Sequence, residues 1–182
     1  MIEKYALFKV FNGLRESSQK ESVRSLAKKS KVSVASAKRC MDYLFEKKII
    51  KREILGKLHQ LAFDNSSILT RQLKIAFSIA EICESSIIEE LTNNYQDIFS
   101  ITLFGSIAQG KDTPNSDIDI LIISRKEIKL RPLAGEKKLN RELSIIKYTL
   151  SEWRRKSRSD AVFYQRVIID GISLYGELPV VQ

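Results

Sequence analysis

Two aspartates two residues apart and a glycine-serine pair are the residues whose types and spacing could do chemistry in this chain. Asp117 and Asp119 open one apolar run, and Gly105 and Ser106 follow another. Alternate side chains of a strand point to the same face, so the two carboxylates are expected to converge. Close carboxylates repel unless a cation lies beside them, and oxygen ligands of this kind suit Mg²⁺ or Mn²⁺. The pattern therefore predicts a divalent metal site.

The glycine-serine pair predicts a phosphate site next to the metal. Without a side chain at Gly105 the backbone can approach a phosphate closely, and Ser106 can donate its hydroxyl where a helix begins. A phosphate cradle beside two metal-binding carboxylates is what phosphoryl or nucleotidyl transfer requires, because metal ions orient a triphosphate and neutralise its charge. We therefore expect transfer chemistry on a nucleoside triphosphate.

The motifs LFGS, AQG, SD and DIDILI together resemble the nucleotidyltransferase superfamily typified by polymerase beta, and most closely the minimal nucleotidyltransferases of prokaryotes. The resemblance covers roughly residues 96–182. It implies that Gly105 and Ser106 contact the triphosphate, that Asp117 and Asp119 bind the metal, and that a nucleoside monophosphate passes to a hydroxyl group. Such proteins are often antitoxins of helical ribonuclease toxins, so the resemblance also implies a protein acceptor, a tyrosine of a partner.

The third carboxylate of the family is not evident in the sequence. The strand expected to carry it is ELSIIKYT, residues 142–149, and the aligned position is Ser144. Glu142 lies two residues earlier, on the same strand face, and is the candidate substitute as base or ligand; a solvated charge is the other interpretation. Because a base contributes separately from the phosphate clamp, this departure bears on turnover more than on binding. The alternative function is a DNA-binding transcriptional regulator with a catalytically impaired, nucleotide-sensing transferase fold.

Most of the positive charge lies in the first third of the chain. Residues 1–65 contain 15 Lys or Arg against 7 Asp or Glu, whereas residues 66–182 contain 16 against 15. With a net charge of +9, this imbalance indicates two modules, of which the first faces a polyanion such as duplex DNA. A solvated lysine-rich surface is the other interpretation.

Three helices and a hairpin are expected in the basic third. Apolar residues recur at helical spacing in residues 2–14, 21–30 and 34–48, and Gly13 is expected to help end the first helix. The following segment, IIKREILGKLHQLAF, contains two short alternating runs joined through a glycine and a lysine, as in a two-stranded wing.

This order of elements resembles the winged helix-turn-helix regulators of archaea and bacteria. The resemblance implies that Ser36, Lys38 and Arg39 of the third helix lie near bases or phosphates and that Lys57, at the tip of the wing, approaches the DNA backbone. Protein contact or dimerisation is the alternative use of such a module.

A long helix is expected between the two modules. Residues 65–94 contain no Pro or Gly and their apolar residues recur mostly at helical spacing, with a break expected near residues 84–86. The apolar stripe would pack on both modules or on a second copy, so a homodimer is expected. No run approaches the roughly 20 apolar residues of a membrane span, and a secretory signal is not evident, so we expect a cytoplasmic protein.

These patterns predict an α/β (α+β) fold in three parts: a winged helix over residues 1–65, a helical connector over 66–95 and a polymerase beta-like nucleotidyltransferase domain with a mixed sheet over 96–182. Within the last part, a helix capped by Ser151 and a closing strand over residues 172–175 are expected. The two cysteines, Cys40 and Cys83, have no metal-ligand spacing and are expected to be buried thiols.

Overall fold

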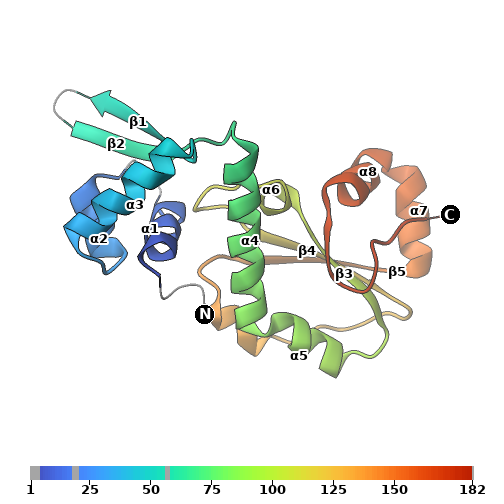
Figure 1. Ribbon diagram of the computed structural model, residues 1–182. Helices are drawn as coiled ribbons and strands as arrows, with labels where there is room; N and C mark the ends of the chain where they lie inside the picture. The colour runs from blue at the N-terminus through green and yellow to red at the C-terminus, as the bar shows by residue number, and fades with distance from the viewer. Residues whose placement is uncertain (1–4, 18–20, 56–57, 182) are drawn as a thin grey trace. The chain divides into compact units, whose positions relative to one another are not determined.

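The computed structural model describes residues 5–17, 21–55 and 58–181 (Figure 1). The chain divides into two compact units, Met1–Lys74 with Thr113–Asn115, and Ile75–Asp112 with Ser116–Gln182. The residues predicted as a connector are thus shared between the two units. Within the described residues, no helix has the length and apolar character that crossing a membrane needs.

Three helices followed by a two-stranded hairpin form most of the first unit. They are α1 (Ala6–Arg15), α2 (Val23–Lys29), α3 (Val34–Glu46), β1 (Ile50–Leu55) and β2 (Leu58–Phe63). The strands are antiparallel, with Ile50 opposite Phe63. The hydroxyls of Ser22 and Ser33 cap α2 and α3 by accepting hydrogen bonds from backbone N–H groups. The expected order of helices and hairpin is confirmed.

Gly13 does not end the first helix, contrary to the expectation from the sequence. Helix α1 continues to Arg15, and Gly13 is buried inside it. A Cβ built on Gly13 would overlap the hydroxyl of Ser30, which ends α2. Glycine at this position therefore lets α2 pack closely against α1, and its role is in packing rather than in helix termination.

The helix break near residues 84–86 is confirmed. Helix α4 (Ile68–Ser85) and helix α5 (Ile87–Asn94) are separated by Ser86, whose φ of +64° lies in the left-handed region. In the second unit, much of the predicted apolar stripe is used internally, because Ile82 and Leu91 are fully buried in the core. This internal packing accounts for part of the stripe without a second copy of the chain.

A mixed four-stranded sheet forms the centre of the second unit. Its strands are β3 (Ile98–Phe104), β4 (Ile118–Ser124), β5 (Leu143–Thr149) and β6 (Ile172–Tyr175), in the order β5-β4-β3-β6. Strand β3 pairs antiparallel with β4 and β6, whereas β4 and β5 are parallel. The mixed sheet is confirmed, and the closing strand has the predicted bounds.

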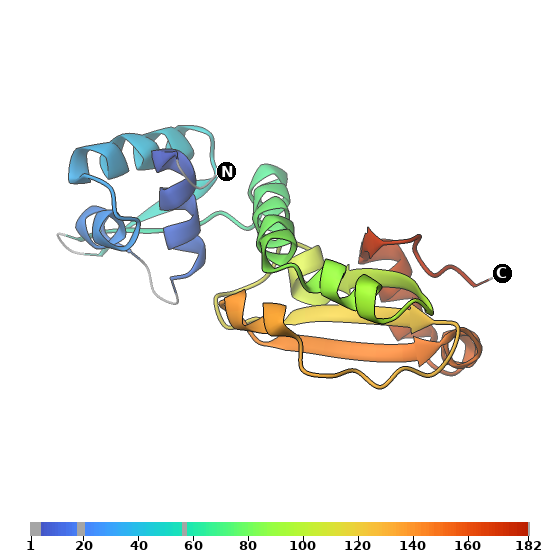
Figure 2. The same cartoon turned by 90° about the horizontal axis from the view of Figure 1, so that it is seen from below.

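Helices cover both faces of this sheet. Ile120 and Ile122 of β4 share one core with α5, which lies along the sheet in Figure 2. Leu121 and Ile123 share the opposite core with α7 (Leu150–Ser159) and α8 (Ala161–Asp170). The alternation along β4 follows from the period of a strand, and burial on both faces explains why β4 is an unbroken apolar run.

Two local expectations about the second unit and the cysteines are wrong. Thr149, not Ser151, caps α7: its hydroxyl accepts from the N–H of Glu152, whose carboxylate in turn accepts from the N–H of Thr149. The reciprocal pair satisfies two backbone donors and so fixes the start of the helix.

The cysteines are not both buried, because Cys83 is exposed and Cys40 only half-buried.

Candidate functional site

The antiparallel pairing of β3 and β4 brings the predicted phosphate turn against the predicted metal ligand. Phe104, the last residue of β3, lies opposite Asp119. The next residue, Gly105, has a φ of +77°, and a Cβ built on it would overlap the Oδ2 atom of Asp119. The carboxylate thus occupies the space that a side chain would need. The backbone conformation favours glycine here, and the close approach of the carboxylate leaves no space for a Cβ.

Asp119 is a half-buried carboxylate in an environment that disfavours its charge. Burial raises the pKa of Asp119 above its usual range; the hydrogen bond from the Ser144 hydroxyl opposes this shift, and the nearby charge of Asp117 adds to it. Asp117 itself lies immediately before β4 and is exposed. A cation beside the two carboxylates would relieve both the desolvation and the repulsion.

Ser106 lies in α6 (Gly105–Ala108), a single helical turn between the two strands. Its carbonyl accepts a hydrogen bond from the N–H of Lys111 at 2.9 Å, which closes the turn. The side chain of Gln109, which follows α6, donates to Asp170 Oδ2 of α8 at 2.7 Å. The turn is therefore held by one backbone hydrogen bond and by one side-chain hydrogen bond to α8. The contact to Asp170 could not be predicted from the local sequence.

The parallel pairing of β5 with β4 places Ser144 directly opposite Asp119. The Ser144 hydroxyl and the Asp119 carboxylate are hydrogen-bonded. Glu142, the proposed substitute carboxylate, lies just outside β5; its carbonyl accepts from the N–H of Ile118 at 2.8 Å, and its side chain is exposed. A hydroxyl, not a third carboxylate, is therefore the β5 group beside Asp119.

The donor set fits a divalent ion that is shared with a substrate. In the part of the chain that the structure describes, no three His, Cys, Asp or Glu side chains gather as a metal site. Mg²⁺, however, commonly takes one or two protein carboxylates and completes its octahedral shell with water and substrate phosphates. Asp117 and Asp119 can supply those two carboxylates, with the partly desolvated Asp119 as the group that gains most from a cation.

The residues predicted to contact DNA lie on α3, with one exception. Lys38 and Arg39 are exposed. Ser36 belongs to the first turn, where the Ser33 hydroxyl accepts from its N–H at 3.1 Å and donates to its hydroxyl at 2.9 Å. Lys57 lies outside the described residues. The structure thus gathers two cations on the exposed part of one helix.

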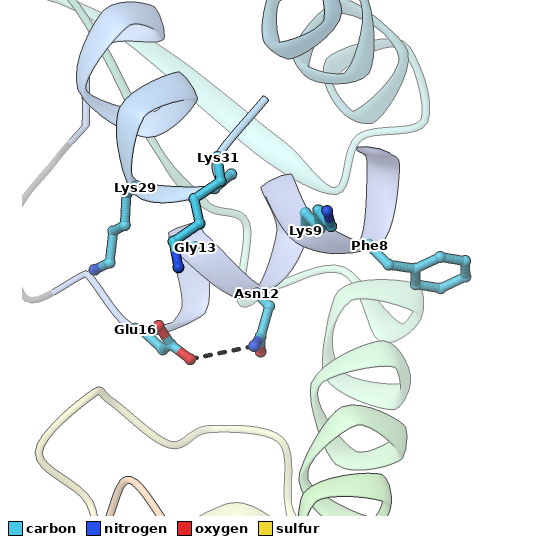
Figure 3. A pocket seen from close by; sticks show the side chains of 8 residues that line it. Phe8, Lys9, Asn12, Gly13, Glu16, Lys29 and Lys31 are labelled. Carbon is cyan, nitrogen blue, oxygen red and sulfur yellow. Dashed lines mark hydrogen bonds between the residues drawn. The ribbon is translucent and has the colours of Figure 1, made fainter. Parts of the chain in front are cut away.

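A pocket of about 310 Å³ is a second cationic feature of the first unit (Figure 3). Lys9, Lys29 and Lys31 line it, together with Asn12 and Glu16. The Asn12 amide donates to Glu16 Oε1 at 3.1 Å, the contact drawn as a dashed line in Figure 3. Three cations against one carboxylate leave the pocket with a net positive charge. Sequence periodicity could not reveal it, because its lining comes from two helices.

Comparison with known proteins gives a family match over the second unit. The family model "Polymerase beta, Nucleotidyltransferase" matches residues 86–178. This range includes the phosphate turn and the carboxylates of the second unit: Gly105, Ser106, Asp117, Asp119 and Glu142. Among solved structures, an NMR structure of protein BT2368 from Bacteroides thetaiotaomicron is 23% identical, with 36% of this chain and 78% of that chain covered and a TM-score of 0.32. A crystal structure of a mutant of the toxin-antitoxin pair MntA-HpeT is 29% identical, with 52% and 72% covered and a TM-score of 0.35. Comparison with curated proteins gave no match.

Proposed function

This chain belongs to the polymerase beta nucleotidyltransferase family, and from that premise we propose that it transfers a nucleoside monophosphate from a nucleoside triphosphate to a hydroxyl group. The observation that carries this proposal is the close approach of Gly105 to the Asp119 carboxylate. Nucleotidyl transfer requires a phosphate-binding turn and a metal-binding carboxylate within reach of the same phosphate group. A turn that glycine alone can form beside that carboxylate is the local structure such a site needs.

In the proposed reaction, the acceptor oxygen forms a bond to the α-phosphorus, and the bond from that phosphorus to the oxygen bridging to the β-phosphate breaks. Pyrophosphate leaves, and the acceptor proton passes to water or to Glu142. Gly105 and Ser106 would hold the phosphates through backbone N–H groups and the serine hydroxyl, and Asp117 and Asp119 would hold Mg²⁺ or Mn²⁺. The ion would supply charge neutralisation and orientation of the triphosphate.

The test is incubation of the purified protein with each labelled nucleoside triphosphate and Mg²⁺, with and without the protein encoded beside it. Covalent transfer that depends on Asp117 and Asp119 is the expected result. The acceptor we propose is a hydroxyl on a partner protein, in line with the antitoxin resemblance. Nucleotide binding without transfer to any acceptor would instead favour the DNA-binding regulator with an impaired transferase fold.

Replacing Ser144 by aspartate tests whether turnover is limited by the absence of a third carboxylate. Ser144→Asp adds a carboxylate directly opposite Asp119, so we expect tighter Mg²⁺ binding and a transfer rate higher by about tenfold or more. Ser144→Ala is the control, because it removes the hydrogen bond to Asp119 without adding a charge. Pyrophosphate release measures the rate. If Ser144→Asp is no faster than Ser144→Ala, a third carboxylate at this position does not limit turnover.

Duplex DNA binding by the first unit is a second proposed function. It is supported by the order of three helices and a hairpin, which is that of a winged helix, and by the exposure of Lys38 and Arg39 on α3. Arg52 of β1 forms an ion pair with Asp42 of α3 and lies 4.5 Å from the ring centre of Phe45. These contacts fix the hairpin to the proposed recognition helix.

Lys38→Ala combined with Arg39→Ala is expected to weaken duplex DNA binding. Each cation that neutralises a phosphate releases counterions, so the slope of log K against log salt concentration should fall by about two. Fluorescence anisotropy over a salt series measures it. Arg154→Ala with Arg155→Ala is the matched control, since it removes the same charge from exposed positions of α7. A slope that stays the same in the α3 variant would contradict a role of this helix in DNA binding.

Homodimerisation is also proposed. It is supported by the exposed apolar side chains at the start of α4, where Ile68 is 62% and Leu69 is 46% exposed. Two-fold symmetry is the usual assembly of helix-turn-helix proteins on DNA.

A further inference from the structure

A buried ion pair joins the two chain segments that flank the candidate site. Arg141 Nη1 and Asp112 Oδ2 are 2.9 Å apart, and the two side chains are only 5% and 1% exposed. Asp112 lies in the loop that follows α6, and Arg141 lies just before β5. The pair therefore links the exit of the phosphate-binding turn to the start of the strand that carries Ser144.

The Asp112 end of the pair is one residue away from a hydrogen bond to the phosphate-binding turn. Lys111 precedes Asp112 and donates its N–H to the carbonyl of Ser106 at 2.9 Å. Gly110, with a φ of +65°, turns the chain between the end of α6 and Lys111. A displacement of Asp112 would thus be transmitted to the backbone of Ser106 through a single peptide unit.

The Arg141 end of the pair is also one residue away from a backbone hydrogen bond, in this case one to the segment that carries the two aspartates. Glu142 follows Arg141, and its carbonyl accepts from the N–H of Ile118 at 2.8 Å. Ile118 is the residue between Asp117 and Asp119, and its register with β5 begins the parallel pairing of β4 and β5. Both halves of the site are therefore attached to one ion pair by equally short paths.

Stability alone does not explain this pair. Removing two charges from water is costly, and apolar side chains of similar volume often stabilise a fold as well or better. Among the described residues, neither Nη1 nor Nη2 of Arg141 has a hydrogen-bond partner of good geometry, so the desolvation of the guanidinium is only partly offset. What a buried pair of opposite charges can supply is a single defined arrangement of the two segments that carry it.

We propose that Asp112 and Arg141 are positioning residues, which hold the phosphate-binding turn and the two aspartates in one arrangement. The catalytic consequence rests on the proposed transferase function: a misplacement of about 1 Å in a site of this kind can lower the rate about a hundredfold. The structural claim is independent of nucleotide, because the ion pair and both backbone hydrogen bonds are present in the protein alone.

The test replaces the pair by apolar side chains, Asp112→Leu with Arg141→Met, and follows hydrogen exchange at the amides of Lys111 and Ile118. We expect an unfolding temperature equal to or above that of the wild type, together with exchange at least tenfold faster at these two amides. The matched control is Asp97→Leu with Lys126→Met, which removes an exposed ion pair of the same unit and should leave both amides unchanged. Unchanged exchange in a folded Asp112→Leu/Arg141→Met protein would overturn the proposal.

Arg141→Lys keeps the positive charge but not the planar guanidinium. This variant replaces Asp112→Leu/Arg141→Met in the experiment if the apolar pair prevents folding. It is expected to accelerate exchange at the same amides, and wild-type exchange rates in this folded variant would also overturn the proposal. If the wild-type protein transfers nucleotide, kcat should fall about a hundredfold in the apolar variant while nucleotide affinity changes less. A wild-type protein without transfer would count against the proposed function, whereas the exchange experiment would still decide the positioning role.

Discussion

Asp117→Asn combined with Asp119→Asn is expected to abolish nucleotide transfer, lowering the rate by about a thousandfold or more. Asparagine keeps the size of each side chain but removes the charge that would hold a divalent ion, and such an ion contributes several kcal/mol to transition-state stabilisation. Transfer of labelled nucleoside monophosphate in Mg²⁺ measures the loss. Glu127→Gln with Glu177→Gln, two exposed carboxylates outside the site, should transfer at the wild-type rate. A wild-type transfer rate in the Asp117→Asn/Asp119→Asn variant would exclude these carboxylates from catalysis.

Thermal unfolding separates this loss of function from a loss of structure. The pKa of Asp119 is raised mainly by burial, so the folded protein binds a proton at this site more tightly than the unfolded chain does. Stability from this group is therefore present at low pH and is lost as pH rises through the folded pKa. At neutral pH and without divalent ions, the variant should unfold at a higher temperature than the wild type. A lower unfolding temperature would mean that the carboxylates stabilise the fold.

Gly105→Ala is expected to lower transfer by about a hundredfold or more. The new Cβ would meet Asp119 Oδ2, and alanine at a φ of +77° is strained, so the turn and the carboxylate must move apart. A displacement of about 1 Å is enough for such a loss in a site that depends on orientation. Labelled transfer at saturating and limiting nucleotide concentrations distinguishes an effect on kcat from one on binding.

Gly176→Ala is the matched control for this variant. Gly176 has a φ of +67°, and a Cβ built on it would overlap the carbonyl oxygen of Phe99, so strain and overlap resemble those at Gly105. Both variants should lose about 1–3 kcal/mol of stability, but Gly176→Ala should keep the transfer rate. If the two lose activity equally, general destabilisation accounts for the effect and the contact between Gly105 and Asp119 is not needed for catalysis.

Several elements of the second unit could be predicted because they have strong local patterns. Strand β6 was predicted with its observed bounds, and the break at Ser86 lies where the helical spacing falters. The cap of α7 also has a local signal in the sequence, because Thr149 and Glu152 have the spacing of a capping box. The packing role of Gly13 could not be predicted, because its neighbour Ser30 ends another helix and local spacing does not reveal that contact.

The candidate site was predictable in its residue types but not in its contacts. The spacing of Asp117 and Asp119 is local and indicates their chemistry. The hydrogen bond between Ser144 and Asp119 depends on the parallel register of β4 and β5, which tertiary packing sets. The ion pair of Asp112 with Arg141 joins two loops, where no periodicity connects the partners. Contacts between residues far apart in the sequence are thus the part of the site that sequence periodicity does not predict.

The close approach of Gly105 to Asp119 also limits how related sequences can diverge. Because the carboxylate fills the space of a Cβ at position 105, the two positions cannot drift separately. A descendant that lost the carboxylate would be released from the steric constraint, and only the left-handed backbone would remain, which asparagine and aspartate tolerate. The residue that a homologue carries after its equivalent of β3 should therefore report whether natural selection still maintains its carboxylate.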